Sequence, residues 1–417
     1  MSAIDVREAI TQAHHEEWAR VVAALARRFR DLDIAEEAAA EAFATAVERW
    51  PADGVPPNPG AWLTTTANRK AIDRIRRENK RDDKQKEARM AALPSRGDDR
   101  PEPLGAIDDD RLRLIFTCAH PALAMEARLA LTLRLVAGLT VPEIARAFLV
   151  AETALGQRIT RAKAKIKAAR IPYRVPSAED LPARVAGVLT VLFLVFNEGY
   201  LATGPDTDPI RHDLTAEAIR LTRLIRVLLP EDGEVAGLLA LMLLTEARRA
   251  ARVSAGGELV ALDEQDRGAW DATLIAEGHR LVRERLAAAA AGEAPGRYQI
   301  LAAINAVHTS ARDMRDTDWS QILALYDQLV RVDASPIIAL NRAIAVAELD
   351  GPEVALAVVD RLEPRLAGYH PYHATRADLL RRLGRSRAAR AAYDKAIDLA
   401  GNTAEIAALT RRRDQLG

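Results

Sequence analysis

Apolar residues recur along most of this chain at the three- and four-residue spacing of amphipathic helices. The segment 33–50 is one such helix, rich in alanine and acidic at its polar positions, and the segment 60–77 is a second helix whose polar positions are mostly basic. The alternating pattern that indicates strands is barely present. We therefore expect an all-α fold.

Helical periodicity is lost in the stretch 78–103, which is dense in charge, proline and glycine. Such a composition predicts a linker. We expect a first helical domain at 1–80, a charged linker at 81–107 and a second helical domain at 108–173. A helical extension at 174–295 and a repeat region at 296–417 would follow.

Two short helices around a tight turn are indicated between 139 and 166. Thr140 and Glu143 have the spacing of a capping box. Leu149 occupies the turn where Gly is frequent, and Ala151 stands where a Ser or Asp cap would save about 1 kcal/mol. The second helix has a buried stripe formed by Leu155, Ile159, Ala162 and Ile166. Despite the two irregular positions, this pattern is typical of a helix-turn-helix.

The second of these helices is basic. From Gly156 to Arg170 there are six Lys or Arg residues and no Asp or Glu, which favours contact with phosphates while polar side chains contact base edges. A solvated basic face on an ordinary helix is the alternative. The candidate contacts with duplex DNA are Thr153, Gln157, Arg158, Arg161 and Lys165.

The segment 60–77 carries a second candidate nucleic-acid surface. A protein that separates DNA strands needs cations for the backbone and flat side chains on which unpaired bases stack. Trp62 and the arginines near it supply both, although Trp62 alone could equally be a core aromatic. The acidic helix 33–50 would be repelled by DNA and suits a basic protein surface.

Taken together, residues 1–173 resemble the two domains of sigma-70 type initiation factors of the extracytoplasmic-function group. The resemblance implies that 1–80 is region 2, which binds core RNA polymerase and recognises the −10 element, and that 108–173 is region 4, which recognises the −35 element. The core-binding positions carried over are Glu36, Glu37, Glu41, Phe43 and Trp50. The −10 positions are Trp62, Asn68, Arg69, Arg74, Arg76 and Arg77.

One departure from the family pattern concerns base recognition. The family's Ala-Arg-Asn-x-Ala-Ile-Asp appears here as Ala67-Asn-Arg-Lys-Ala-Ile-Asp73. Arg69 therefore occupies the position where the family commonly has the Asn implicated in contacting a flipped −10 base, which leaves the base preference open.

Most of the chain lies beyond this resemblance. The segments 196–202 and 262–271 resemble the helical C-terminal extension of one subgroup of these factors, which ends in tetratricopeptide-like repeats. The candidate regulatory residues are Asn197, Glu198, Tyr200, Asp263 and Asp266. Their carboxylates could alternatively serve acid–base catalysis or bind a divalent cation. No His or Ser partner has a suitable spacing, so we expect neither an enzyme nor a metal site.

The end of the chain repeats with an offset of 34 positions, for example from Arg342 to Arg376. The same offset places Ala355 on Ala389 and Val359 on Tyr393. This period is the tetratricopeptide length, and such arrays usually bind a peptide or another domain.

Composition adds limits to this picture. The formal net charge is zero and there is one cysteine, Cys118, which fits a reducing cytoplasm. The apolar run Val185–Phe196 is shorter than the ~20 residues of a membrane span. No phosphate-binding loop or nucleophile elbow is present, so no cofactor is expected.

The sequence thus predicts a cytoplasmic sigma factor whose partners are core RNA polymerase and promoter DNA. A regulatory protein, or a contact within the chain, is expected at the repeats. Two alternatives stay open: a helix-turn-helix regulator with a ligand- or partner-sensing C-terminal domain, and a repeat scaffold whose basic helices are incidental.

Overall fold

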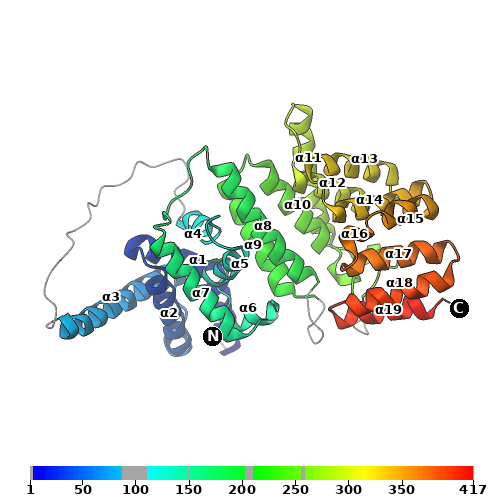
Figure 1. Ribbon diagram of the computed structural model, residues 1–417. Helices are drawn as coiled ribbons and strands as arrows, with labels where there is room; N and C mark the ends of the chain where they lie inside the picture. The colour runs from blue at the N-terminus through cyan, green and yellow to red at the C-terminus, as the bar shows by residue number, and fades with distance from the viewer. Residues whose placement is uncertain (1–2, 87–109, 149, 202–209, 255–258, 417) are drawn as a thin grey trace. The chain divides into compact units, whose positions relative to one another are not determined.

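The computed structural model describes residues 3–86, 110–148, 150–201, 210–254 and 259–416. Throughout these ranges the regular secondary structure is helical, apart from an isolated bridge between Val253 and Leu259. The all-α prediction is confirmed. The chain divides into two compact units, residues 1–191 and 192–417 (Figure 1).

Unit 1 begins with three helices that pack on one another: α1 (Ala3–Phe29), α2 (Leu32–Asp53) and α3 (Pro59–Lys86). Asp31 starts α2 because its side chain accepts hydrogen bonds from the backbone N–H groups of residues 33 and 34. Asn58 caps α3 in the same way through the N–H of Ala61. α3 continues to Lys86, beyond the boundary predicted at 80. The reason is that 78–86 consists largely of good helix formers without Pro or Gly.

The second part of unit 1 contains α4 (Asp110–Cys118), α5 (Met125–Leu131), a π-helical turn η1 (Thr132–Val136), α6 (Val141–Ala147) and α7 (Glu152–Ala168). The capping box at the start of α6 forms: Thr140 N–H donates to Glu143 Oε2 at 2.7 Å. Ala151 makes no side-chain cap at α7, as its lack of a polar side chain predicts. All four residues of the predicted buried stripe of α7 are buried. Leu149 lies outside the described residues.

The boundary between the two units falls within α8 (Leu181–Tyr200). This helix is longer than the apolar run that the sequence singled out. Among the described residues it is the one helix long and apolar enough to cross a membrane by length and composition, and 39% of its most apolar window is buried. The core helix of a soluble protein can be equally long and apolar.

Unit 2 is built around α10 (Gly233–Glu246), in which every residue from Val235 to Glu246 is buried. Around it pack α9 (His212–Leu228), α11 (Ala272–Ala290) and α12 (Arg297–Ser310). Gly237 permits the close approach of α10 and α12, because a Cβ atom there would lie 2.5 Å from the backbone nitrogen of Gln299. The short 3₁₀ turns η2 (Arg249–Ala251) and η3 (Arg267–Ala269) connect α10 to α11.

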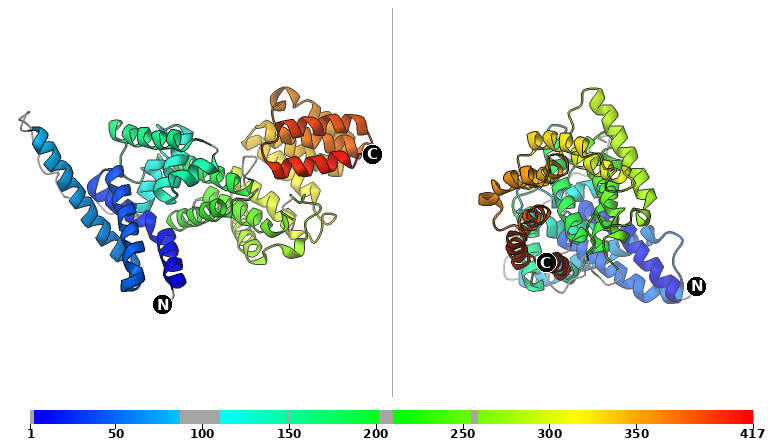
Figure 2. Two further views of the ribbon diagram at one scale, coloured as in Figure 1. Left: turned by 90° about the horizontal axis from the view of Figure 1, so that it is seen from below. Right: turned by 90° about the vertical axis from the view of Figure 1, so that its right-hand side faces the viewer.

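The chain continues as α13 (Trp319–Val332), α14 (Pro336–Leu349), α15 (Pro352–Asp360), α16 (Glu363–Leu366), α17 (His370–Arg382), α18 (Ser386–Leu399) and α19 (Thr403–Asp414). α14 and α17 begin 34 positions apart, at 336 and 370, and α15 and α18 begin 34 apart, at 352 and 386. The orange and red helices in Figure 2 lie side by side at the end of the chain. The predicted period therefore corresponds to a repeating helix pair.

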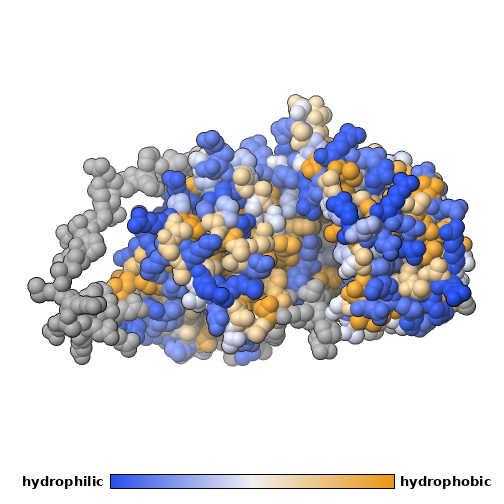
Figure 3. Space-filling view, in the orientation of Figure 1, coloured by the Kyte–Doolittle hydropathy of each residue, from blue (hydrophilic) through white to orange (hydrophobic). Residues whose placement is uncertain are grey.

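The paired positions of this repeat share their burial. Ala355 and Ala389 are both fully buried, as are Val359 and Tyr393 to within 1%. Ion pairs recur as well: Asp360 binds Arg376 at 2.8 Å, and Asp394, 34 positions later, binds Arg413 at 2.9 Å. On the face shown in Figure 3, hydrophilic and apolar residues are interspersed over these helices rather than gathered in one apolar patch.

Candidate nucleic-acid and polymerase surfaces

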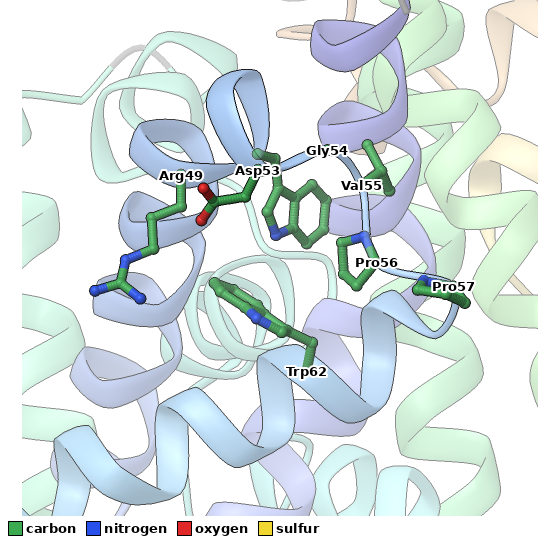
Figure 4. A pocket seen from close by; sticks show the side chains of 8 residues that line it. Arg49, Asp53, Gly54, Val55, Pro56, Pro57 and Trp62 are labelled. Atoms are coloured by element: carbon green, nitrogen blue, oxygen red, sulfur yellow. The ribbon is translucent and has the colours of Figure 1, made fainter.

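A hollow of about 280 Å³ lies where the loop after α2 meets α3. Its walls include Trp50, Trp62, Arg49 and the prolines Pro56 and Pro57. The ring of Trp62 projects from α3 towards α2, on the side that carries Arg49 (Figure 4). Trp62 meets the buried Trp50 edge to face at 5.5 Å. The hollow thus combines flat apolar walls with an exposed guanidinium, which suits an unpaired base and its phosphate.

The predicted −10 residues occupy different sides of α3. Trp62, Arg69 and Arg76 are seven positions apart, so they share one face, on which both arginines are exposed. Asn68 lies on another side, where its Oδ1 accepts from Arg28 of α1 at 3.3 Å. Two further arginines contact nearby carboxylate and carbonyl groups: Arg74 pairs with Glu37 of α2, and Arg77 donates to the carbonyl of Asp73.

On α7, the predicted duplex contacts form an exposed surface opposite the buried stripe. Thr153, Gln157, Arg161 and Lys165 are exposed and lie four positions apart, while Arg158 beside them is half-buried. Arg161 Nε donates to the carbonyl of Gln157 at 3.2 Å, which orients the guanidinium along the helix. Because polar and basic groups alternate on this face, it can contact base edges and phosphates together.

The predicted core-binding residues of α2 fall into exposed and buried sets. Glu37 is exposed and Glu41 is half-buried; they pair with Arg74 and Lys70 of α3 near the surface, where ion pairs contribute little stability and leave the carboxylates available. The others face the interior of unit 1, and these are Glu36, Phe43 and Trp50, which are 8%, 7% and 1% exposed.

Two cations that sequence reasoning left out of the site contact Glu36. Arg134 of η1 and Lys163 of α7 both donate to its carboxylate, and Lys163 also binds Asp33 at 2.9 Å. Lys163 had been counted with the basic residues of α7, yet it is only 9% exposed. The sequence offered one signal of this burial, since Lys163 directly follows Ala162 of the buried stripe. Nothing in the sequence around Arg134 marks it.

The candidate regulatory residues of unit 2 make different contacts. Tyr200 stacks under Arg252, whose Cζ lies 3.3 Å from the ring centroid, and Asp263 pairs with Arg412 of α19 at 3.6 Å. Asp266 caps η3 through the N–H of Gly268. Asn197 and Glu198 lie in the last turn of α8. In the part of the chain that the structure describes, no group of three His, Cys, Asp or Glu residues is arranged to hold a metal ion.

Comparison with known families assigns the two halves of unit 1. Residues 15–81 match the model of sigma-70 region 2, and residues 113–166 match that of sigma-70 region 4. The chain belongs to the sigma-70 family of RNA polymerase sigma factors. Its sigma-70 domains imply binding to core RNA polymerase and to promoter DNA.

The part of the chain that follows region 4 matches a further family model. Residues 184–287 match a family of unknown function, DUF6596. The protein is 44% identical over 400 residues to the uncharacterized protein R00370 of Rhizobium meliloti (strain 1021), a match that covers 95% of this chain and 93% of that relative. No solved structure matches.

Proposed function

We propose that this protein is a cytoplasmic sigma factor of the extracytoplasmic-function group that directs core RNA polymerase to particular promoters. α2 binds core, the Trp62 hollow and the Arg69–Arg76 face of α3 bind the separated −10 strand, and α7 contacts the −35 duplex through Thr153, Gln157 and Arg161. Unit 2 is a regulatory extension that ends in tetratricopeptide-like repeats.

The support for the proposal is that unit 1 has two candidate nucleic-acid surfaces of different kinds. The α3 surface has an aromatic wall and exposed arginines, which suit a single strand. The α7 surface has a regular polar and basic stripe on one helix, which suits a major groove. A sigma factor needs both surfaces on one chain, whereas a duplex-binding regulator needs only the second.

The test is run-off transcription with purified core RNA polymerase and this protein, on a pool of genomic fragments from the source organism. We expect new transcripts that depend on the protein and share a −35/−10 pair. Core polymerase alone is the control, together with a Trp62→Ala chain that retains α7.

The second candidate function is a helix-turn-helix regulator with a partner-sensing extension, which the exposed α7 surface would serve equally well. It predicts tight, sequence-specific binding to duplex DNA without polymerase and no transcript from core. Sequence-specific duplex binding with silent run-off would therefore replace the sigma proposal with this one.

A further inference from the structure

A groove of about 370 Å³ lies on the surface of unit 2, between α11, α12 and α13 (Figure 1). No residue that the sequence singled out lines it. Its floor is α12, where Ala303, Ala306 and Ser310 are three and four positions apart and therefore share one face. Because a helix rises about 1.5 Å per residue, this floor is about 10 Å long, which is the length of two helical turns.

The walls of the groove are two helices that run in the same direction. On α11, His279 Nε2 contacts Thr309 Oγ1 of α12 at 2.7 Å, and Arg285 Nε donates to Gln299 Oε1 at 3.3 Å, so α11 and α12 are antiparallel. α13 follows α12 through the short loop 311–318 and packs back against it, so it is antiparallel to α12 as well. A groove between two parallel helices has the shape into which a further helix packs.

Apolar side chains line the part of the groove that is remote from this loop. Val282 and Leu286 are one turn apart on the α11 wall, and Leu325 lies on the α13 wall. Leu286 is 57% exposed, so its apolar surface is left open to water. An amphipathic helix that enters such a groove anchors through apolar residues at i and i+3 or i+4. The apolar part of the groove therefore fits two anchors of this kind, above a floor of small residues that lets the backbone approach.

The charged groups of the groove are arranged asymmetrically. Arg283 lies on the α11 wall between the two apolar residues, where it is exposed and makes no ion pair with a described residue. Asp316 and Asp318 lie at the loop end of the groove and are exposed as well. A helix has a partial positive charge at its N-terminus. A helix bound with this end at the two carboxylates, and with an acidic residue opposite Arg283, complements both sets of charges.

We propose that this groove binds an amphipathic helix of a partner protein, which places two apolar residues on the floor, an acidic residue opposite Arg283 and its N-terminus at Asp316 and Asp318. The inference deepens the proposed function and rests on it, because it gives the regulatory extension a partner. Charge complementarity selects this occupant. A helix with a basic residue at its middle would meet Arg283 with a like charge, which disfavours binding.

The probe is a displayed library of random peptides of about 15 residues, which is long enough for about four helical turns, and the full-length chain is the bait. The test variant is Ala306→Phe, which fills the floor of the groove. Its matched control is Ala324→Phe, since Ala324 is an exposed residue of α13 that does not line the groove. We expect the selected peptides to become helical on binding, measured by circular dichroism, and to bind Ala306→Phe about tenfold more weakly than Ala324→Phe.

A second pair of variants tests the charges and remains decisive if Ala306→Phe fails to fold, because both positions are exposed. Arg283→Glu should weaken binding of the selected peptides about tenfold, since it places like charges opposite each other. Changing the acidic residue of the peptide to Lys should restore the affinity for Arg283→Glu. The matched control is Arg280→Glu on the same helix. Arg280 is 63% exposed and lies outside the groove, so this variant should bind the peptides as the wild type does.

Three results would overturn the inference: an empty selection, selected peptides that bind Ala306→Phe and Ala324→Phe alike, or equal affinities for Arg283→Glu and Arg280→Glu. Analytical ultracentrifugation adds a fourth, because a wild-type dimer that becomes a monomer in Ala306→Phe would assign the groove to a second copy of this chain. The binding assays contain no polymerase. An active run-off assay without peptide binding therefore contradicts this inference alone, whereas peptide binding with a silent run-off assay contradicts the proposed function alone.

Discussion

Two lysines of α7, two positions apart, have opposite environments. Lys165 is exposed on the side that faces solvent, while Lys163 is 9% exposed and binds two carboxylates of α2. Residue type alone assigns both to a phosphate contact. At the residue scale, the groups that surround a lysine determine whether it can bind DNA, because a buried cation bound to carboxylates is not available to DNA.

Trp62 gives a prediction at the −10 surface. Trp62→Ala removes the flat wall of the hollow, and we expect strand opening, measured by permanganate reactivity at the −10 element, to fall about tenfold or more, since stacking on one aromatic contributes about 1–3 kcal/mol per base. Trp62→Phe should retain part of the activity. Equal loss of −35 duplex binding in Trp62→Ala would instead indicate misfolding.

His308 gives a prediction about pH. Burial, followed by the nearby Arg248 and Arg267, lowers the pKa of His308 to about 4. The unfolded chain, with a His pKa of about 6.5, then binds more protons than the folded one between these values, so stability falls as pH drops through this window. Between pH 7.5 and 5 the loss is about 2 kcal/mol.

Urea denaturation at the two pH values measures this loss. His308→Gln should remove that part of the pH dependence, whereas the same substitution at His373 of α17 should leave it in place. An identical pH dependence in the wild type and in His308→Gln would contradict the assignment.

At the scale of the element, amphipathic periodicity located the helices well, but their ends depended on local chemistry. The buried stripe of α7 follows the predicted positions, since each of its four residues is buried. α3 continues to Lys86, into the segment whose charge density was taken to indicate a linker, because Glu, Lys, Arg and Gln also favour helix.

The α7 surface gives a prediction that separates base contacts from phosphate contacts. Arg161→Ala should weaken −35 duplex binding by about 1–3 kcal/mol and relax base preference at one position. Lys165→Ala should weaken binding to all duplexes alike and lower the salt dependence, the slope of log K against log salt, by about 1. Fluorescence anisotropy at several salt concentrations measures both, and equal effects on specific and random duplexes for Arg161→Ala would refute its role.

The repeat helices give a prediction about stability. Tyr393 is 1% exposed and lies in the cluster formed by α14 to α18. Tyr393→Ala should lower the free energy of unfolding by about 3–5 kcal/mol because it leaves a cavity. Tyr393→Phe keeps the ring and removes a buried hydroxyl that makes no hydrogen bond, so it should change the free energy of unfolding by less than about 1 kcal/mol. Chemical denaturation measures both; a small effect of Tyr393→Ala would mean that α18 does not pack as described.

At the scale of the whole molecule, the question is what unit 2 does for unit 1. We expect deletion of unit 2 to change promoter output in cells, because the extension is proposed to set activity. Two truncated chains are compared, one ending at Arg174 and one ending at Val191. Truncation after Arg174 also removes the first part of α8, whose Arg184 donates to the carbonyl of Phe116 in unit 1, whereas truncation after Val191 keeps that contact.

The two truncations separate regulation from stability. Equal changes in reporter output from both would support a regulatory extension. If reporter output changes only after truncation at Arg174, the effect is assigned to loss of the α8 contact with α4. If reporter output is unchanged after both truncations, the regulatory proposal is contradicted.

The sequence by itself determined the helical class, the helix-turn-helix and the repeat period, because each rests on residues close together in the chain: the capping box at Thr140, the stripe of α7, and the offset that superposes Val359 on Tyr393. Only the tertiary structure decided which charges face solvent and which face one another. Asp33 and Lys163 are far apart in sequence. No local sequence pattern indicates whether a lysine will bind a phosphate or a carboxylate on another helix. That choice depends on how α2 and α7 pack, and therefore on the whole of unit 1.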